Sequence, residues 1–261
     1  MPLEAKSPMY PTGNTILITG GGSGIGRGLA ESFHALGNQV IVSGRRRHAL
    51  DETTAANPGM KSLSVDIEKP ESLRAFAAQA IAQFPSINVL INNAGIMRRE
   101  NLLEQEPDLA DAESIVATNL LGPIRLTAAL LPHLRAQPRA AVINVSSGLA
   151  FLPMARTPTY CATKAALHSY TLSLRAQLRN TNIEVIELIP PYVATHLMDG
   201  FNNPRAMPLD KFIVEAMEIL RTPPTPPEIC VESVNTLRFA AENGNFDTIF
   251  ARLNAPPADA H

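Results

Sequence analysis

Short apolar segments rich in valine and isoleucine recur along the chain up to Pro190, and longer stretches with helical periodicity separate them. Strands that are apolar on both faces are typical of a parallel sheet covered by helices on both sides. We therefore predict strands at Thr15–Thr19, Gln39–Ser43, Lys61–Val65, Asn88–Asn92, Ala140–Ser146 and Ile183–Ile189. Right-handed crossovers between such strands give an α/β fold with a doubly wound, mostly parallel sheet of six to seven strands and helices on both faces.

The pattern changes after Pro190, where prolines and asparagines divide the chain into shorter pieces. Helical periodicity returns at Leu209–Leu220 and Glu228–Glu242, and Phe246–Phe250 is a candidate for a weak seventh strand. These pieces are too short to build a second hydrophobic core. We predict a single domain over residues 1–261, with an N-terminal extension at 1–13, a small C-terminal substrate lid at 194–227 and a mobile tail at 254–261.

Composition narrows the class of protein. Hydrophobic residues make up 45% and charged residues 18% of the 261 residues, which is typical of a globular domain. The net charge of −2 favours neither a nucleic acid nor an anionic membrane as partner, and the apolar runs fall short of the roughly 18 residues of a membrane helix. The N-terminal residues lack the apolar core of a signal peptide, so we expect a cytoplasmic protein.

Cysteine and histidine usage argues against metal binding. Cys161 and Cys230 are the two cysteines, too few for a disulfide framework or a four-thiolate zinc site. The six histidines are scattered and form no paired motif on a predicted helix. We therefore predict no metal site.

A glycine-rich segment, Thr19–Gly26, stands directly between the first predicted strand and a helical stretch at Arg27–Leu36. Glycines let the backbone turn sharply and approach a diphosphate, and the N-terminus of the next helix offers free N–H groups. The alternative is an ordinary glycine-rich turn, but the position between strand and helix favours a Rossmann-type dinucleotide site. The residues predicted to contact the cofactor here are Gly20, Gly22, Ser23, Gly24, Ile25 and Gly26.

The end of the second strand bears on the choice of cofactor. An acidic residue there would bind the ribose hydroxyls of NAD, but this chain has Ser43-Gly44-Arg45-Arg46-Arg47. Guanidinium and hydroxyl groups suit a 2′-phosphate, so we predict NADP(H) over NAD(H), with Arg45 as the main contact and Ser43 assisting. The alternative is a solvated basic loop. After the third strand, Asp66 and Ile67 could contact the adenine, although Asp66 could equally cap a helix.

Tyr160 and Lys164 share one face of a predicted helix, because residues four apart lie one turn from each other. A lysine cation beside a phenol favours the phenolate and brings the pKa of the tyrosine, ordinarily about 10, closer to neutrality. Ser147 follows the fifth strand at the sheet edge where ligands of such folds bind, so it can donate to a substrate oxygen. Its neighbour Ser146 is expected to be structural.

These residues together resemble the short-chain dehydrogenase/reductase family in its single-domain form. The resemblance rests on Thr19–Gly26 (T-G-x-x-x-G-x-G), the N-N-A-G motif at 92–95, and Asn119, Ser147, Tyr160 and Lys164 in this order. The stretches 119–123, 146–153 and 189–191 are most similar to the DltE-like branch. Pro190-Pro191 departs from the usual Pro-Gly, and a second proline excludes a positive φ at that turn.

The resemblance implies a catalytic tetrad of Asn119, Ser147, Tyr160 and Lys164. In it Tyr160 is the general acid or base, Ser147 polarises the carbonyl, Lys164 holds the nicotinamide ribose and lowers the tyrosine pKa, and Asn119 holds a water for proton relay. It also implies that Asn93, Ala94 and Gly95 line the adenosine side, and that Val193 and Thr195 meet the nicotinamide carboxamide. Cys161 is expected to be a buried thiol and His168 a packing residue.

The substrate pocket is expected to have a largely apolar wall, which favours an apolar or aromatic carbonyl compound or alcohol. The residues predicted to form this wall, or to touch ligand from the lid, are Leu149, Phe151, Leu152, Met154, Tyr192, His196 and Met198, with Met97 and Arg98 as candidates for the rim. The helical stretches 108–134 and 160–179 are apolar around much of their surface, and in this family they pair subunits. We expect a homodimer or homotetramer.

Three functions are compatible with these features. The first is an NADP(H)-dependent alcohol dehydrogenase or ketoreductase. The second is a regulatory protein that binds NADP(H) without turnover, although such a sensor needs no proton donor like Tyr160. The third is an epimerase or dehydratase, whose relatives generally carry a larger C-terminal domain than this chain has after Pro190. We favour the first.

Overall fold

A computed structural model describes residues 10–104, 109–197 and 203–255. Its centre is a seven-stranded sheet in the order β3-β2-β1-β4-β5-β6-β7, and every neighbouring pair is parallel. The strands are β1 (Thr15–Thr19), β2 (Gln39–Gly44), β3 (Lys61–Ser64), β4 (Ile87–Asn92), β5 (Ala140–Val145), β6 (Ile183–Ile189) and β7 (Glu228–Cys230). The predicted doubly wound α/β fold is confirmed, because every residue of β4 and β5 is buried between two layers of helices.

The prediction was wrong about the seventh strand. Phe246–Phe250 lies in a helix, α9 (Phe246–Leu253), and the seventh strand is the three-residue β7. The expected helix at Glu228–Glu242 is likewise replaced by β7, a 3-10 turn at Glu232–Val234 and the short helix α8 (Asn235–Arg238). A strand of three residues has no periodicity to detect. It exists because β6 offers a free edge on which fully buried Ile229 pairs with Leu188.

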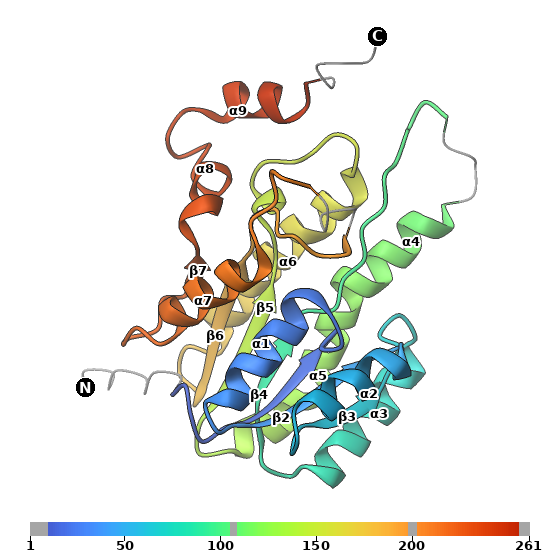
Figure 1. Cartoon of the computed structure of the whole chain (residues 1–261), viewed down its shortest axis with the longest axis vertical. Coiled ribbons are helices and arrows are strands. Elements are labelled where there is room, and N and C mark those ends of the chain that lie inside the picture. Colours follow the sequence, from blue (N-terminus) through green and yellow to red (C-terminus); the bar gives the residue numbers. More distant parts are fainter. Residues whose placement is uncertain (1–9, 105–108, 198–202, 256–261) are drawn as a thin grey trace.

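Helices cover the sheet on both faces. On one face lie α1 (Gly24–Ala35), α2 (Arg47–Ala56) and α7 (Leu209–Leu220), and Figure 1 shows α1 and α7 side by side across the sheet. The other face packs against α3 (Pro70–Gln83), α5 (Gly122–Ala136) and α6 (Pro158–Gln177). Each face thereby builds its own hydrophobic core, one on either side of the strands.

Part of the predicted lid packs into the hydrophobic core. Residues 194–227 were predicted to cover the substrate, but Phe212 of α7 is fully buried in the core that α1 shares with the sheet. The side chain of Ile213 also approaches Gly28 of α1, where an added Cβ would lie 2.7 Å from Ile213 Cγ1. This helix is therefore a structural layer of the fold. The prediction of a substrate lid then applies only to the parts of 194–227 before and after α7, and it stays a prediction.

One helical segment passes a length and hydropathy test for a membrane span. It runs over Ala110–Ala136, where α4 (Ala110–Val116), a π-helix (Ala117–Leu121) and α5 follow one another. Buried core helices pass the same test, and Leu126, Leu130 and Leu134 of this segment are fully buried against the sheet. The expectation that the protein uses no membrane stays a prediction.

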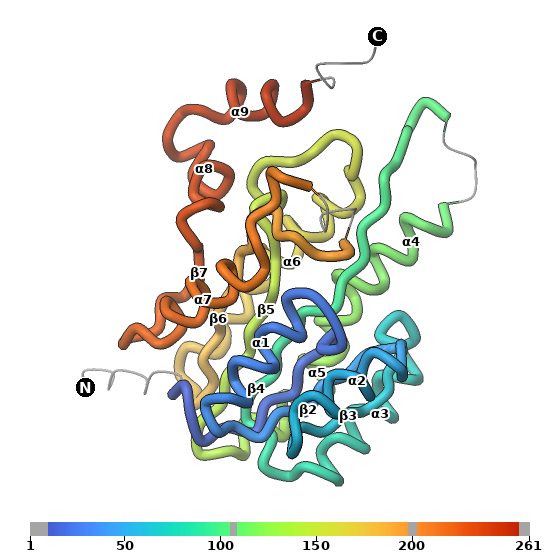
Figure 2. The backbone as a smooth tube through the Cα atoms, viewed as in Figure 1, coloured from blue at the N-terminus to red at the C-terminus, as the bar shows by residue number. Residues whose placement is uncertain are grey.

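The fold positions a ligand at the carboxyl edge of the sheet. The chain leaves β1 toward β2 on one side, while β4 lies on the other side of β1, so the crossover direction reverses between β1 and β4. Loops diverge at such a switch point and leave a crevice for a ligand. Figure 2 follows the chain from β7 through α8 to α9, which passes above the loop that leads into α6.

Candidate active site

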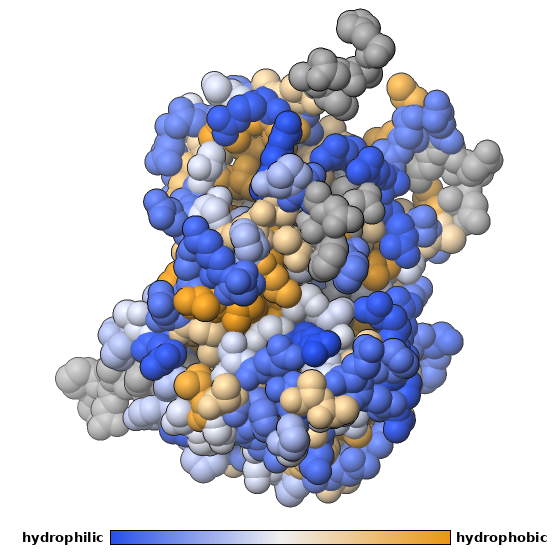
Figure 3. All heavy atoms as spheres, viewed as in Figure 1, coloured by the Kyte–Doolittle hydropathy of each residue, from blue (hydrophilic) through white to orange (hydrophobic). Residues whose placement is uncertain are grey.

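A cavity of about 1020 Å³ occupies this carboxyl edge. Residues at or just after the ends of six strands line it, among them Gly20, Gly44, Val65, Asn93, Ser147 and Val193. On the face seen in Figure 3, apolar residues are visible within hollows whose rims are mostly hydrophilic. The cavity is large enough for a dinucleotide together with a small second ligand.

The glycine loop closes tightly over the end of β1. Gly20 has φ +68°, and an added Cβ there would lie 2.9 Å from the Cα of Ala94, so a larger residue would be both strained and crowded. An added Cβ on Gly26 would collide with the carbonyl of Gly20. Gly20, Gly22, Ser23, Gly24 and Ile25 line the cavity, whereas Gly26 lies behind them and permits the close packing.

Helix α1 begins at Gly24 with no side-chain cap and no acidic residue in its first turn. Its first N–H groups are therefore left to an outside acceptor at the edge of the cavity. Gly24 has φ +53°, and an added Cβ would lie 3.3 Å from Thr195 Cγ2, so the loop after β6 faces this helix end closely. A phosphate group fits the geometry and charge of such a site.

The N-N-A-G segment holds the glycine loop in place. Thr19 Oγ1 accepts from the backbone N–H groups of Asn93 at 3.0 Å and Ala94 at 3.1 Å, and Asn93 Nδ2 donates to the Thr19 carbonyl at 3.0 Å. Asn93, Ala94 and Gly95 also line the cavity as predicted. Gly95 lies between the tetrad residues, because a Cβ there would be 3.4 Å from Asn119 Oδ1 and 3.8 Å from Lys164 Nζ.

Two arginines lie at the end of β2. Arg45 and Arg46 both line the cavity; Arg45 lies 3.6 Å from Glu68, and Arg46 donates to Ser23 Oγ of the glycine loop at 2.9 Å. The expectation for Ser43 was wrong, because its side chain is fully buried and its hydroxyl donates to the Ile18 carbonyl. Sequence reasoning passed over Arg46, although it stands in the same basic run.

Asp66 and Ile67 follow β3. Ile67 lines the cavity together with Val65, which leaves an apolar surface suited to a flat ring. The Asp66 carboxylate accepts from the Glu68 N–H at 3.3 Å and lies 3.8 Å from Lys69 Nζ, so it stabilises the turn leading into α3. A contact of Asp66 with adenine stays a prediction.

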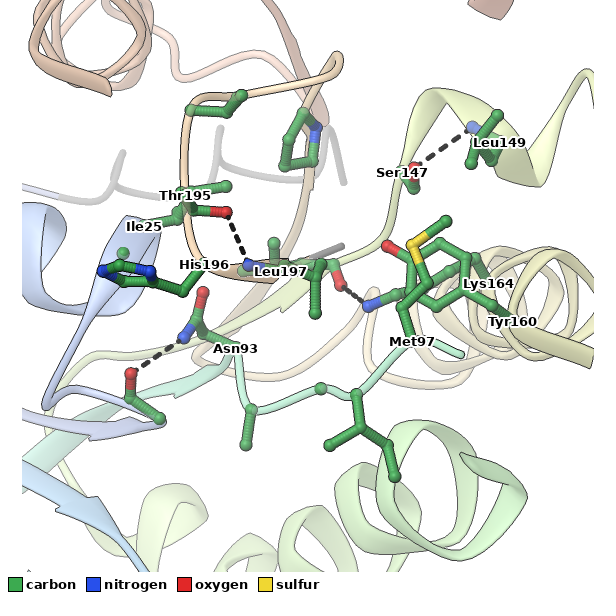
Figure 4. Close-up of a pocket in the computed structure, with 18 of the residues that line it drawn as sticks. Ile25, Asn93, Met97, Ser147, Leu149, Tyr160, Lys164, Thr195, His196 and Leu197 are labelled. Atoms are coloured by element: carbon green, nitrogen blue, oxygen red, sulfur yellow. Dashed lines mark hydrogen bonds between the residues drawn. The ribbon is translucent and has the colours of Figure 1, made fainter. Parts of the chain in front are cut away.

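The Tyr160, Lys164 and Ser147 side chains come together at the other end of the cavity (Figure 4). Lys164 Nζ donates to the Val145 carbonyl at 2.8 Å and lies 5.6 Å from the centre of the Tyr160 ring. Ser147 Oγ accepts from the Leu149 N–H at 3.1 Å and also hydrogen-bonds to the Tyr160 hydroxyl. All three side chains are buried, and the first turns of α6 fix the phenol beside the ammonium.

Burial controls the protonation of this pair. It raises the pKa of Tyr160 to about 12, against a lowering by the Ser147 hydrogen bond, so the predicted lowering of the tyrosine pKa by Lys164 is not found. Burial also lowers the pKa of Lys164 to about 8, although the carboxylate of Glu187 opposes that shift. At neutral pH the phenol is protonated and the lysine is mostly a cation that takes up and releases protons easily.

Asn119 fastens two segments of the site to each other. This residue is fully buried in the π-helix Ala117–Leu121; its Oδ1 accepts from Ile96 N at 2.9 Å and its Nδ2 donates to Ile96 O at 2.8 Å. The side chain thus fastens the segment after β4 to the helix, and the role of Asn119 in holding a water stays a prediction. Asn119 positions Gly95 and Ile96 along the cavity.

Two buried hydroxyls at the cavity have no hydrogen-bond partner among the described residues, Thr118 Oγ1 and Ser146 Oγ. Ser146 was expected to be structural, but it lines the cavity instead. Buried polar groups are normally satisfied, so these orphaned hydroxyls fit a ligand with polar atoms in the cavity. Together with the open helix end of α1, they make the residues present compatible with a bound nicotinamide dinucleotide.

The substrate end has the predicted apolar wall in part. Leu149, Met154 and Tyr192 line the cavity, as do Met97, Arg98, Val193, Thr195 and His196, while Met198 lies outside the described residues. Phe151 and Leu152 do not line it; Phe151 packs edge-on against His168 with ring centres 4.6 Å apart.

Sequence reasoning missed the contribution of the C-terminal helix. Ile249, Arg252 and Leu253 of α9 line the cavity, and Leu253 packs on the cluster that contains Met154 and Tyr160. Asn254 Oδ1 accepts from Ala155 N at 2.6 Å and so holds the end of α9 to the loop before α6. The apolar spacing within α9 was the available signal, but it was assigned to a strand.

The family follows from sequence comparison. The model of the short chain dehydrogenases matches residues 14–206. An uncharacterized oxidoreductase of Bacillus subtilis, DltE, is 38% identical over 251 residues, which cover 94% of this chain and 98% of that protein. The chain belongs to the short-chain dehydrogenase family.

Solved structures of short-chain dehydrogenases share the fold over most of their length. One from Burkholderia cenocepacia in complex with NADP superposes with a TM-score of 0.79 at 25% identity and covers 95% of this chain and all of that one. The 3-ketoacyl-(acyl-carrier-protein) reductase of Brucella melitensis, complexed with NADH, has a TM-score of 0.73 at 29% identity, covering 81% of this chain and 91% of that one. Both nicotinamide cofactors thus occur among similar chains.

Proposed function

We propose that this short-chain dehydrogenase transfers hydride between NADP(H) and a carbonyl compound or secondary alcohol with an apolar or aromatic body. The observation that carries the proposal is the buried Tyr160, hydrogen-bonded to Ser147 and adjacent to Lys164, at the end of a cavity whose other end is the glycine loop. The chain supplies a proton donor and a phosphate site in one cavity, which is what carbonyl reduction requires.

The glycine loop and the N-terminus of α1 would hold the diphosphate, with Val193 and Thr195 beside the nicotinamide and Lys164 at its ribose. When bound, NADPH supplies the hydride. Ser147 uses its lone pair to accept from Leu149, so its own hydrogen remains to donate to a substrate carbonyl oxygen. Tyr160, protonated because burial raises its pKa to about 12, gives its proton to the same oxygen as the alcohol forms.

Proton return to Tyr160 is the task of Lys164. The pKa of Lys164 is lowered to about 8, so this ammonium releases and regains a proton far more readily than an exposed lysine. In the oxidative direction the roles reverse, and Tyr160 accepts the proton of the alcohol. Positioning by these side chains supplies most of the rate enhancement, because the redox chemistry belongs to the cofactor.

The preference for NADP(H) over NAD(H) is supported by Arg45 and Arg46 at the end of β2, where the residues lining the cavity include no acid. The similar structure from Burkholderia cenocepacia holds NADP. The alternative is a regulatory protein that binds NADP(H) without turnover. Burying the polar groups of Tyr160 and Lys164 costs free energy, and a protein without turnover gains no proton donor in return.

The test is turnover by the purified protein. We expect it to consume NADPH faster than NADH with a panel of aliphatic, aryl and keto-ester carbonyls, and Tyr160→Phe to lose at least about a hundredfold in kcat while its Kd for NADPH changes less than about twofold. The matched control is Tyr170→Phe, one helical turn or more from the cavity on the same helix. Equal loss of NADPH binding and turnover in Tyr160→Phe would contradict the assigned role.

We further propose a homodimer or homotetramer in the cytoplasm, without nucleic acid or membrane as partner. The proposal rests on the family resemblance, in which the helical stretches 108–134 and 160–179 pair subunits. Light scattering of the purified protein distinguishes a monomer, which would contradict the expectation, from a dimer or tetramer.

A further inference from the structure

The charged side chains that line the substrate end of the cavity are all positively charged. Arg98, Arg99, Arg156, Arg205 and Arg252 line it, and no aspartate or glutamate is among the lining residues that the structure describes. The whole chain carries a net charge of −2, so these cations are concentrated here against the overall balance. A cleft lined by one sign of charge focuses its field and attracts ligands of the opposite sign.

The arginines differ in whether the protein neutralises them. Arg98 lies 3.6 Å from the carboxylate of Asp111 and is partly compensated. Arg156, Arg205 and Arg252 form no ion pair within residues 10–104, 109–197 and 203–255. Three guanidinium groups that pair with no carboxylate of the described residues thus line one cavity, where they can bind an outside anion.

Arg156 lies close to the reacting groups. Its Nε donates to the sulfur of Met154 at 3.2 Å, and Met154 belongs to the same apolar cluster as Tyr160. The guanidinium therefore contacts a side chain of the cluster that also holds the phenol. A ligand whose carbonyl oxygen meets Tyr160 and whose body lies along Met154 would bring its far end to Arg156.

Arg252 approaches the same place from a different element. It precedes Leu253, which packs on the cluster of Met154 and Tyr160, and Asn254 fixes the end of α9 to the loop that carries Arg156. Arg205 lies on a third segment, which Met207 joins to the loop after β6 through a hydrogen bond to Tyr192 and a β-bridge with Val193. Three separate segments thus bring cationic groups to the mouth of one cavity.

We infer that the substrate carries an anionic group, a carboxylate or a phosphate, at the end remote from its carbonyl, and that Arg156 and Arg252 bind this group. The inference rests on the proposed function, because it assigns the substrate class of that same site. It also sharpens the expectation of an apolar or aromatic substrate: Leu149 and Met154 contact the body, and the arginines contact the charged end.

The rival explanation is that these arginines bind the cofactor phosphates. The glycine loop, the N-terminus of α1 and the Arg45–Arg46 pair already provide that site at the other end of the cavity. The two explanations differ in one measurable quantity. Loss of Arg156 and Arg252 leaves the Kd for NADPH unchanged if they serve the substrate, and weakens NADPH binding if they serve the cofactor.

The experiment uses 4-formylbenzoate and its neutral methyl ester, two aryl aldehydes that differ in one charge. Binding of each to the full-length protein loaded with NADP⁺ is measured by calorimetry, and kcat/KM is measured with NADPH. We expect the carboxylate to bind at least roughly tenfold more tightly than the ester, and to weaken on going from low to high salt while the ester does not.

The variants Arg156→Gln and Arg252→Gln should each remove most of the preference for the carboxylate and leave the ester unaffected. Arg221→Gln, an exposed arginine outside the cavity, is the matched control and should change neither. A phosphate-bearing probe, 4-formylphenyl phosphate, distinguishes the two anions: tighter binding than the carboxylate would favour a phosphorylated substrate.

Equal binding of carboxylate and ester by the wild-type protein would overturn the inference, as would a preference that survives in both variants. A preference for the carboxylate with no NADPH consumption by either aldehyde would instead keep the anion site and contradict the proposed reductase function. Weakened NADPH binding in Arg156→Gln and Arg252→Gln would assign the arginines to the cofactor.

Discussion

At the scale of single residues, the proposed preference for NADP(H) depends on a few side chains at the end of β2. Gly44 ends β2 beside Arg45, and an added Cβ at Gly44 would meet only Leu50 Cδ2, at 3.9 Å. A Cβ therefore fits at this position without a clash. In the proposed binding mode, positions 44 and 45 determine which charge faces the 2′ position of the adenosine ribose.

Gly44→Asp combined with Arg45→Ala should change the preference from NADPH toward NADH. The aspartate repels a 2′-phosphate and can accept from ribose hydroxyls, and the loss of a guanidinium–phosphate contact alone is worth roughly tenfold to a hundredfold in affinity. The ratio of kcat/KM for NADPH and NADH measures the change. Arg47→Ala, on the solvent-exposed side of the same basic run, is the control, and an unaltered ratio in the double variant would refute the assignment of the 2′-phosphate to this loop.

The element scale explains the protonation of Lys164. Helix α6 carries Lys164 and, one turn later, His168, whose Nδ1 donates to Glu187 Oε2 of β6 at 2.8 Å. Glu187 is fully buried, and its Oε1 has no partner in the part of the chain that the structure describes. This carboxylate raises the pKa of Lys164, although burial still holds that pKa at about 8.

Glu187→Gln should lower the pKa of Lys164 further, because it removes the negative charge that favours the ammonium and keeps an acceptor for His168. If the lysine must be a cation, the alkaline limb of the pH profile of kcat/KM moves to lower pH, by roughly one unit for a charge at this range. Glu187→Asp keeps the charge and should keep the limb in place. If both variants fold and the alkaline limb of the pH profile does not move in Glu187→Gln, activity does not depend on the charge of Lys164.

The elements also show what the sequence could predict. Strands β1 to β6 could be predicted from the sequence, because burial on both faces requires continuous apolar runs such as that of β5. β7 is too short for any period, and its formation depends on the free edge of β6, a tertiary feature. The spacing of Tyr160, Lys164 and Ser147 predicted that they lie together, and the structure places them in one cavity. The bonds of Ser43 and Asn119 to backbone groups distant in sequence, at Ile18 and Ile96, depend on the tertiary fold and could not be predicted from the sequence.

At the scale of the whole molecule, the last helix completes a site that the sheet begins. The chain returns over more than ninety residues to place α9 against the loop before α6, where Asn254 donates to the Pro153 carbonyl at 3.2 Å and accepts from Ala155 N. No residue of α9 is buried, so the helix adds little to the core. We therefore expect changes at the end of α9 to affect ligand binding more than stability, so that mutation can separate the two.

The double variant Leu253→Ala, Asn254→Ala should raise KM for the carbonyl substrate at least roughly tenfold, because it removes the apolar contact above Tyr160 and both hydrogen bonds to the loop. The Kd for NADPH should stay within about twofold, since the glycine loop lies at the other end of the cavity, and Tm should fall only a few degrees. Val214→Ala, a 57% exposed residue of α7 outside the cavity, serves as control. A large drop in Tm with an unchanged KM would mean that α9 supports the fold and takes no part in binding, whereas the expected split would make the C-terminal helix a wall of the substrate site.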